Sequence, residues 1–261
     1  MEKIGFIGMG NMARAIAGGF VAGGAARADS LYAFAPHYDK LCAFAGPLGM
    51  HACRSVDELL SQVDTVVMAV KPYVVEGVLA EIRGALKGKA MLSVVAGYTC
   101  QRYRPLVDES VRVQYIMPNT PCSVGAGMLL FEQESTLRDD EREAAVKLFR
   151  ALGEVEILPT HLMDAAMAVS GCGPAFVAMM IEAMADAGVK YGLPRATAYK
   201  LASQTALGTG KMQIETGMHP GVIKDGVCSP GGTTIRGVEA LEACGLRHAM
   251  FEAVKATLSR D

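Results

Sequence analysis

The chain has 261 residues, of which 51% are hydrophobic and 20% are charged, so it can bury a sizeable core and is not expected to be disordered. Its formal net charge of −2 gives no electrostatic reason to expect nucleic acid or an anionic membrane as a partner. Seven cysteines without a Cys-x-x-Cys pair predict reduced thiols, with neither disulfides nor a metal site. The chain starts directly with a strand-like segment instead of a signal peptide, and no apolar run approaches the ~20 residues of a membrane span. We therefore expect a soluble, cytoplasmic protein that binds no metal, nucleic acid or membrane.

The first glycines lie between a β-rich run, residues 3–7, and a helical pattern that continues through Phe20. They form the turn Gly8-Met-Gly-Asn-Met-Ala13, a Gly-x-Gly-x-x-Ala fingerprint of dinucleotide sites. Gly8 permits the tight turn, Gly10 lets the backbone approach a pyrophosphate, and Ala13 allows close packing of helix and strand. The alternative is a glycine-rich turn without a ligand.

The end of the second expected strand, residues 31–35, bears on the choice of dinucleotide. An NAD-specific site usually has an Asp or Glu there for the ribose hydroxyls, whereas this chain has Ala35-Pro36-His37. Absence of the acid admits NADPH, but no arginine replaces it in this segment, so NADPH is favoured only moderately over NADH. His37 either lies near a 2′-phosphate or is an ordinary surface histidine.

Three further apolar runs, 65–70, 90–96 and 111–117, alternate with helical stretches at 55–61, 72–86 and 99–107. This repetition predicts a parallel, doubly wound sheet, in which the carboxyl ends of the strands share one edge with the ligand cleft. Lys71, Gly97, Asn119 and Thr120 follow these strands and should converge there. We expect Asn119 and Thr120 to contact the nicotinamide end of the cofactor, and Lys71 either to join them or to be only a charge at a helix start.

The C-terminal part of the chain has a different pattern. Two edge strands, 128–132 and 155–159, flank a helix at 139–152, and after Pro159 the chain is helical, with helices at 173–189, 194–216, 234–243 and 246–259. Residues 1–159 are thus predicted to bind the dinucleotide and residues 160–261 to form a helical domain. Residues 173–189 are apolar except for Glu182 and Asp186, so we expect this helix to be buried across a dimer interface. The alternative is a central helix within a monomer.

Residues 219–237 are expected to form an exposed loop that leads into a helix at Thr233 or Thr234. Gly231 and Gly232 would leave backbone N–H groups bare at the positive end of that helix, an arrangement that suits a carboxylate. The alternative is an ordinary loop with a threonine cap. Residues 169–176, at the start of the helical domain, contain no ionisable base, so reduction of a readily protonated C=N bond fits better than oxidation of an alcohol.

Several motifs together resemble the Δ1-pyrroline-5-carboxylate reductase family, and the resemblance covers essentially the whole chain. They are Gly8-Met-Gly-Asn-Met-Ala13, Ala69-Val-Lys-Pro72, Met117-Pro-Asn-Thr-Pro121, Ser170-Gly-Cys-Gly-Pro-Ala175 and, most specifically, Lys224-Asp-Gly-Val-Cys-Ser-Pro-Gly-Gly-Thr-Thr-Ile235. The resemblance implies a Rossmann-type sheet followed by an all-helical dimerisation domain. It implies reduction of (S)-1-pyrroline-5-carboxylate to L-proline with NADPH or NADH, the last step of proline biosynthesis, by homodimers that often assemble into decamers.

The same resemblance assigns roles to residues. Thr234 corresponds to the catalytic threonine whose hydroxyl meets the imine nitrogen, and the substrate carboxylate would be held by Ser229, Gly231, Gly232, Thr233 and Thr234. Together with the fingerprint and the strand ends, the predicted cofactor site comprises Gly8, Gly10, Asn11, Met12, Ala35, Pro36, His37, Ala69, Val70, Lys71, Pro72, Gly97 and Asn119.

The chain also departs from the family pattern. Cys172, Phe176 and Cys228 stand where serine, tyrosine and threonine or serine are common, and the Asn-Arg-Ser type of second-strand end is missing. Competing interpretations are a β-hydroxyacid dehydrogenase, another cyclic-imine reductase, and a catalytically silent dinucleotide sensor. The first would need a lysine early in the helical domain, and the last would not need the 229–234 segment.

Overall fold

The computed structural model describes residues 1–259, and the chain divides into two compact units between Gly171 and Cys172. This division lies beyond the boundary expected at Pro159, because helix α7 (Met163–Ser170) packs against strand β7 of the first unit.

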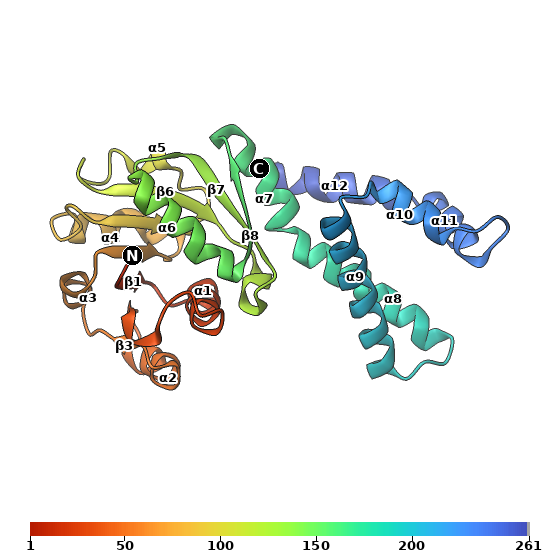
Figure 1. The fold of residues 1–261 in the computed structure, drawn as a ribbon, viewed down its shortest axis with the longest axis horizontal. Helices are drawn as coiled ribbons and strands as arrows, with labels where there is room; N and C mark the ends of the chain where they lie inside the picture. The colour runs from red at the N-terminus through yellow and green to blue at the C-terminus, as the bar shows by residue number, and fades with distance from the viewer. Residues whose placement is uncertain (260–261) are drawn as a thin grey trace. The chain divides into compact units, whose positions relative to one another are not determined.

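Within residues 1–259, eight strands form one sheet in the order β3-β2-β1-β4-β5-β6-β7-β8 (Figure 1). All neighbouring strands are parallel except β6 and β7, which are antiparallel. The predicted doubly wound fold is confirmed. The strands are β1 (Ile4–Ile7), β2 (Leu31–Phe34), β3 (His51–Ala52), β4 (Thr65–Met68), β5 (Ala90–Ser93), β6 (Arg112–Met117), β7 (Gly127–Ser135) and β8 (Gly153–Leu158).

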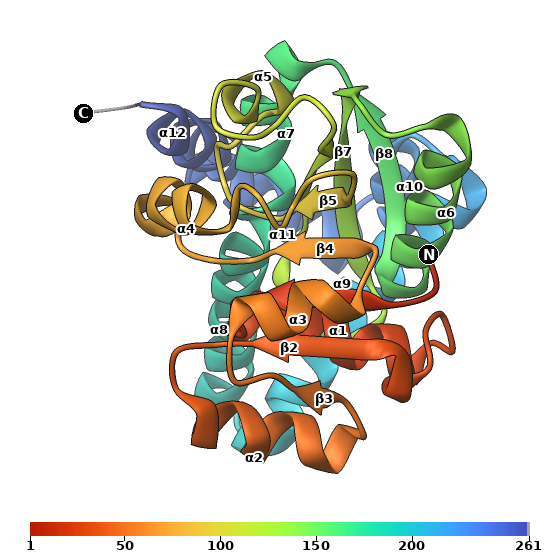
Figure 2. The same cartoon turned by 90° about the vertical axis from the view of Figure 1, so that its left-hand side faces the viewer.

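Helices cover both faces of this sheet because alternate strand residues point to opposite sides (Figure 2). Phe6 of β1 packs with Phe20 of α1 (Asn11–Ala22), and α2 (Tyr38–Leu48) and α6 (Asp139–Phe149) share that layer. Ile7, the next residue, packs in the opposite layer with α3 (Val56–Gln62), α4 (Val75–Ile82), α5 (Cys100–Tyr103) and α7. The α4 and α5 helices are shorter than the predicted helical stretches 72–86 and 99–107. Short 3₁₀ helices lie at Ala28–Ser30, Pro72–Val74, Thr120–Val124, Arg150–Leu152 and Thr160–Leu162.

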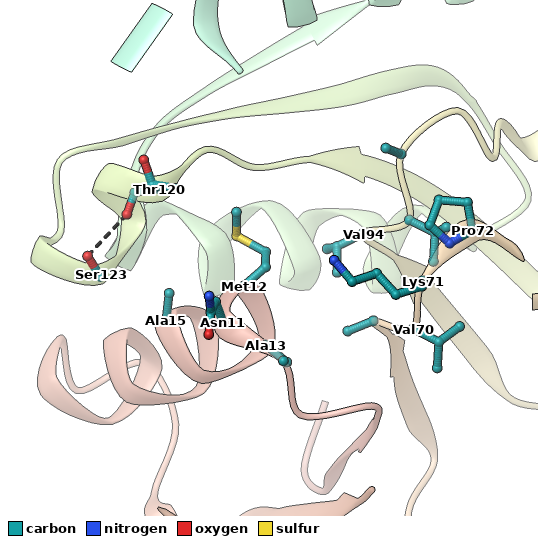
Figure 3. A pocket seen from close by; sticks show the side chains of 14 residues that line it. Asn11, Met12, Ala13, Ala15, Val70, Lys71, Pro72, Val94, Thr120 and Ser123 are labelled. Carbon is teal, nitrogen blue, oxygen red and sulfur yellow. Dashed lines mark hydrogen bonds between the residues drawn. The ribbon is translucent and has the colours of Figure 1, made fainter. Parts of the chain in front are cut away.

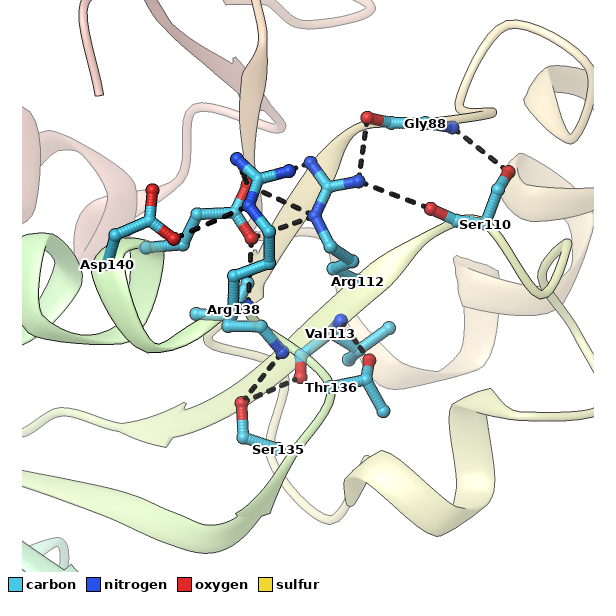
Figure 4. Close-up of polar contacts among 10 residues, drawn as sticks. Gly88, Ser110, Arg112, Val113, Ser135, Thr136, Arg138 and Asp140 are labelled. Carbon is cyan, nitrogen blue, oxygen red and sulfur yellow. Dashed lines mark hydrogen bonds and ion pairs between the residues drawn. The ribbon is translucent and has the colours of Figure 1, made fainter.

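An ionic network ties the antiparallel part of the sheet to α6 (Figure 4). Arg112, at the start of β6, donates through Nε and its second terminal nitrogen to the Glu141 carboxylate, with N–O distances of 2.8 Å. Its first terminal nitrogen donates to the Gly88 carbonyl at 2.9 Å. The Arg138 backbone N–H donates to the same carboxylate at 3.0 Å, and so closes the first turn of α6. A largely buried carboxylate is thereby satisfied by hydrogen bonds and opposite charge.

The second unit is built from helices that bury little within one chain. α8 (Gly173–Lys190) packs on α9 (Arg195–Thr216) through Ala185, Ala198 and Ala202. In α10 (Pro220–Val227), α11 (Thr233–Ala243) and α12 (Leu246–Leu258) no residue is buried. One expectation needs correction, because the first half of the 219–237 loop is the helix α10. The alternative for α8, a central helix within a monomer, is not supported, since Ala185 is its one buried residue in the described chain.

The expectation that no apolar segment is long enough for a membrane span is also wrong. By length and composition alone, the helical stretch Thr160–Lys190 could cross a membrane. A helix whose apolar surface is covered by other protein has the same composition, so this criterion does not distinguish the two environments.

Candidate functional site

A cavity of about 690 Å³ lies at the carboxyl edge of the sheet in the first unit (Figure 3). The turns after β1, β4, β5 and β6 surround it, as expected at the switch point between β1 and β4. Its lining residues are Gly10, Asn11, Met12, Ala13, Ala15, Ala69, Val70, Lys71, Pro72, Val94, Val95, Ala96, Thr120 and Ser123.

Backbone hydrogen bonds beyond the strand ends hold three of these turns together. The Gly8 N–H donates to the Phe34 carbonyl, the Ala69 N–H to Ile7 and the Val94 N–H to Met68, each at 2.9 Å. The parallel ladder therefore continues past the strands, and the turns after β1, β4 and β5 are held by the sheet itself.

The fingerprint turn fits a dinucleotide pyrophosphate. Gly8 has φ +93°, and a Cβ on it would lie 2.7 Å from the Ala69 carbonyl oxygen, so no other residue fits there. Gly10 is the N-cap of α1 and has no capping side chain. A Cβ on Gly10 would meet no protein atom within 4 Å and would instead occupy the cavity. The first N–H groups of α1 are thus left for a ligand at the positive end of the helix dipole.

Three polar side chains line the remainder of this cavity, those of Lys71, Thr120 and Ser123. The exposed Lys71 side chain extends from the end of β4 toward α1 (Figure 3). Thr120 lies across from it, and the Ser123 hydroxyl donates to the Thr120 carbonyl at 3.1 Å. The structure therefore brings Lys71 and Thr120 to the same cavity, as the sequence predicted.

Asn119 and Gly97 do not line this cavity. The Asn119 side chain is 7% exposed; its amide nitrogen donates to the Ser170 carbonyl and its oxygen accepts from the Met128 N–H, both at 2.9 Å. The Gly97 N–H donates to the Tyr115 hydroxyl at 3.2 Å. Asn119 thus holds the end of α7 beside β7. Its expected contact with a nicotinamide stays a prediction, and these hydrogen bonds within the protein argue against it.

A second cavity of about 270 Å³ adjoins the fingerprint turn at the end of β2, and Gly10 lines both cavities. It contains the predicted residues Ala35, Pro36 and His37. Arg14 and Lys40 also line it, and the sequence analysis missed both. Arg14 and Lys40 lie in the first turns of the helices that follow β1 and β2, and a basic residue at such a position is the sequence signal for both.

The predicted substrate residues lie at the start of α11 in the second unit. The Gly232 N–H donates to the Ser229 carbonyl at 3.0 Å, and Gly231, with φ +69°, takes the position that a turn of this kind reserves for glycine. Gly232 is the N-cap of α11 and has no capping side chain, and the helix begins at Thr233 as predicted. The N–H groups of Thr233 and Thr234 are consequently free for a carboxylate.

Two buried thiols of the first unit are poorly suited to nucleophilic chemistry. Burial and nearby Glu132 raise the pKa of Cys100 to about 12, and burial and Glu58 raise the pKa of Cys53 to about 11. Among residues 1–259, no group of three or more His, Cys, Asp or Glu side chains could hold a metal ion. The arrangement is suited to binding and orienting ligands through backbone N–H groups and a few side chains.

Comparisons with known proteins agree with this architecture. A family model for pyrroline-5-carboxylate reductase dimerisation matches residues 160–261, and one for NADP oxidoreductases, coenzyme F420-dependent, matches residues 3–97. The chain is similar to a pyrroline-5-carboxylate reductase of Treponema pallidum, with 43% identity over 98% of this chain and 99% of the relative. One from Escherichia coli is 40% identical over 100% and 97%. The crystal structure of Plasmodium falciparum pyrroline carboxylate reductase with NADP bound superimposes with a TM-score of 0.88 at 31% identity, covering 99% of this chain and 97% of that one.

Proposed function

Because the chain belongs to the pyrroline-5-carboxylate reductase family, we propose that it reduces (S)-1-pyrroline-5-carboxylate to L-proline, with NADPH or NADH as reductant. The observation that carries this proposal is the match to relatives of that name along nearly the whole chain, through both units. In the reaction, a hydride adds to the imine carbon and a proton to the imine nitrogen, which completes the last step of proline biosynthesis.

The first unit would hold the dinucleotide. Backbone N–H groups at Asn11 and Met12 suit the pyrophosphate, and the turns at Ala69–Pro72 and Val94–Ala96 line the cavity beyond it. A reduced nicotinamide, when bound, supplies the hydride. The protein's contribution there is to fix orientation, and the Lys71 ammonium adds positive charge at the same cavity.

The second unit would hold the substrate. The uncapped start of α11 offers its N–H groups to the carboxylate of pyrroline-5-carboxylate, and the Ser229 hydroxyl lies next to them, since a Cβ on Gly232 would be 2.4 Å from its Oγ. We assign to the exposed Thr234 hydroxyl the hydrogen bond with the imine nitrogen. An iminium accepts hydride without an enzymatic base, which agrees with the absence of His, Lys, Asp and Glu from residues 169–176.

A dimerisation domain implies an oligomer, and we propose a homodimer, assembled further into a decamer. The support is the apolar surface of the second unit: Met179 of α8, Leu207 and Ile214 of α9 and Phe251 of α12 are all exposed in one chain. Light scattering after gel filtration should give the mass of two or of ten 27.5-kDa chains, and the mass of one chain would contradict the proposal. We also propose a cytoplasmic location, supported by seven cysteines that are all free.

The decisive test is steady-state turnover of pyrroline-5-carboxylate, followed by loss of absorbance at 340 nm with NADPH and NADH in parallel. We expect cofactor oxidation that depends on the substrate and produces proline stoichiometrically. Binding of the dinucleotide without turnover would overturn the proposal and favour another imine substrate or a sensing role.

A further inference from the structure

The cavity at the end of β2 has a marked excess of positive charge. Of the eight residues that line it, three are basic, Arg14, His37 and Lys40, and none is acidic. Arg14 comes from α1, while His37 and Lys40 come from the start of α2. Asp39 is the nearest carboxylate in sequence, but it is not part of the lining. Segments from two different helices therefore concentrate cationic groups in one small cavity.

The Arg14 guanidinium is held in place before any ligand binds. Its Nε donates to the Met9 carbonyl at 3.1 Å, and its central carbon lies 5.3 Å from the centre of the Phe44 ring. Its two terminal nitrogens have no hydrogen-bond partner within residues 1–259. A guanidinium that is held through Nε and packed on a ring still has its two terminal nitrogens free to donate to two oxygens of one phosphate.

Lys40 is also available to an anion. It is exposed, lies in the first turn of α2 and forms no ion pair in the described part of the chain. A carboxylate that would select NADH is missing, since Ala35 directly follows β2 at the place where such an acid usually lies. The cavity thus offers two unneutralised cations and no group that would repel a phosphate.

This cavity adjoins the larger cavity at the fingerprint turn, where the pyrophosphate is expected, because Gly10 lines both. In folds of this type the ribose of the adenosine lies at the end of β2. We propose that Arg14 and Lys40 bind the 2′-phosphate of NADPH and make the protein selective for NADPH over NADH. This inference rests on the proposed function. It assigns the selectivity to side chains on α1 and α2, not to the segment directly after β2.

Calorimetric titration of the full-length protein with NADPH and NADH tests the subsite without any turnover. We expect the unmodified protein to bind NADPH at least about 10-fold more tightly than NADH. Lys40→Met should raise the dissociation constant of NADPH about 10-fold and leave that of NADH within about 2-fold. Arg14→Met should lower the NADPH-to-NADH selectivity by at least as much, and Arg14→Lys, which keeps the charge and loses the pair of terminal nitrogens, should lie between.

Matched controls separate this role from other effects. Lys147→Met removes one exposed charge from α6, outside the lining of both cavities, and should leave the selectivity unchanged. Adenosine 2′,5′-bisphosphate should lose affinity in the Lys40→Met variant, whereas adenosine 5′-monophosphate should not. Because Arg14 also binds the Met9 carbonyl, its substitution can weaken both dinucleotides, so the ratio of the two affinities is the quantity that decides.

The outcomes distinguish this inference from the proposed function. Equal affinity for the two dinucleotides in the unmodified protein, or equal loss of both in the Lys40 and Arg14 variants, overturns the subsite even if pyrroline-5-carboxylate is reduced. The expected selectivity in a protein that does not reduce pyrroline-5-carboxylate supports the subsite and contradicts the function.

Discussion

The two units of the chain bury their apolar side chains to very different extents. In the first unit, two extensive clusters fill both faces of the sheet, with rings such as Phe6, Phe20 and Phe131 fully buried. In the second, the buried cluster consists of Ala185, Ala198 and Ala202. The first unit therefore has the core of an independent domain, whereas the second presents apolar helices that a single chain does not cover.

The largest effect should come from the core of the first unit. Phe131, on β7, is 0% exposed and packs edge-on against Phe149 at 5.6 Å between ring centres. Phe131→Ala should lower the free energy of unfolding by about 3–5 kcal/mol, through lost burial and a residual cavity. Tyr73→Ala, at a residue 86% exposed in the same unit, is the control and should change stability by less than about 0.5 kcal/mol. Urea unfolding measures both, and similar losses would contradict the burial described here.

A charge on the second unit should break the oligomer and not the fold of one chain. Leu207, on α9, is 60% exposed, so Leu207→Asp would be nearly neutral in a monomer. If a second chain covers this residue, an unpaired carboxylate there should weaken association by about 3 kcal/mol, roughly 100-fold. Analytical ultracentrifugation over a range of concentrations measures the shift. Thr209→Asp, at an exposed position on the other side of the same helix, is the matched control, and an unchanged mass distribution for Leu207→Asp would exclude Leu207 from the interface.

The ionic network on α6 makes the stability of the first unit depend on pH. Burial acts to raise the pKa of Glu141, but hydrogen bonds from Arg112 and from the Arg138 backbone outweigh it, so this pKa lies below its ordinary value. A depressed carboxyl pKa stabilises the fold above the unfolded value of about 4.3 and loses that stabilisation as pH falls through the folded pKa.

Arg112→Met should consequently cost about 2–3 kcal/mol at pH 7, because it leaves a largely buried carboxylate short of its main partner. The cost should shrink as the pH falls through the pKa of Glu141, because a protonated carboxyl no longer needs a cationic partner. Thermal unfolding at pH 7, 5 and 3 measures this. Glu141→Gln should be less sensitive to acid than the unmodified protein, and an equal cost of Arg112→Met at pH 7 and pH 3 would show that its charge is not responsible.

Sequence reasoning succeeded where short-range rules determine the structure. The strand alternation, the fingerprint at Gly8 and the helix start at Thr233 follow from local chemistry, and all three are present. It failed where side chains distant in sequence meet. The Asn119 amide is bonded to Ser170, and Arg14 shares a cavity with Lys40, and neither contact has a periodic or spacing signal. Helix α10 was missed because the whole of residues 219–237 was interpreted as one loop that leads into the next helix, although Pro220 is well accommodated in the first turn of a helix.

The smallest effects are expected at the two helix starts that lack a capping side chain, α1 in the first unit and α11 in the second. A substitution at the start of α1 should change cofactor binding, and one at the start of α11 should change turnover. Gly10→Ala would place a methyl group in the dinucleotide cavity and should raise the dissociation constant of NADPH. Thr234→Ala should leave that constant unchanged and lower kcat/KM by roughly 10–100-fold, about 1.4–2.7 kcal/mol, for the lost contact with the reacting group. Calorimetry and steady-state kinetics on both variants measure this division of roles. If Thr234→Ala retained full activity, Thr234 would be only the second residue of α11, and the imine nitrogen would need another partner.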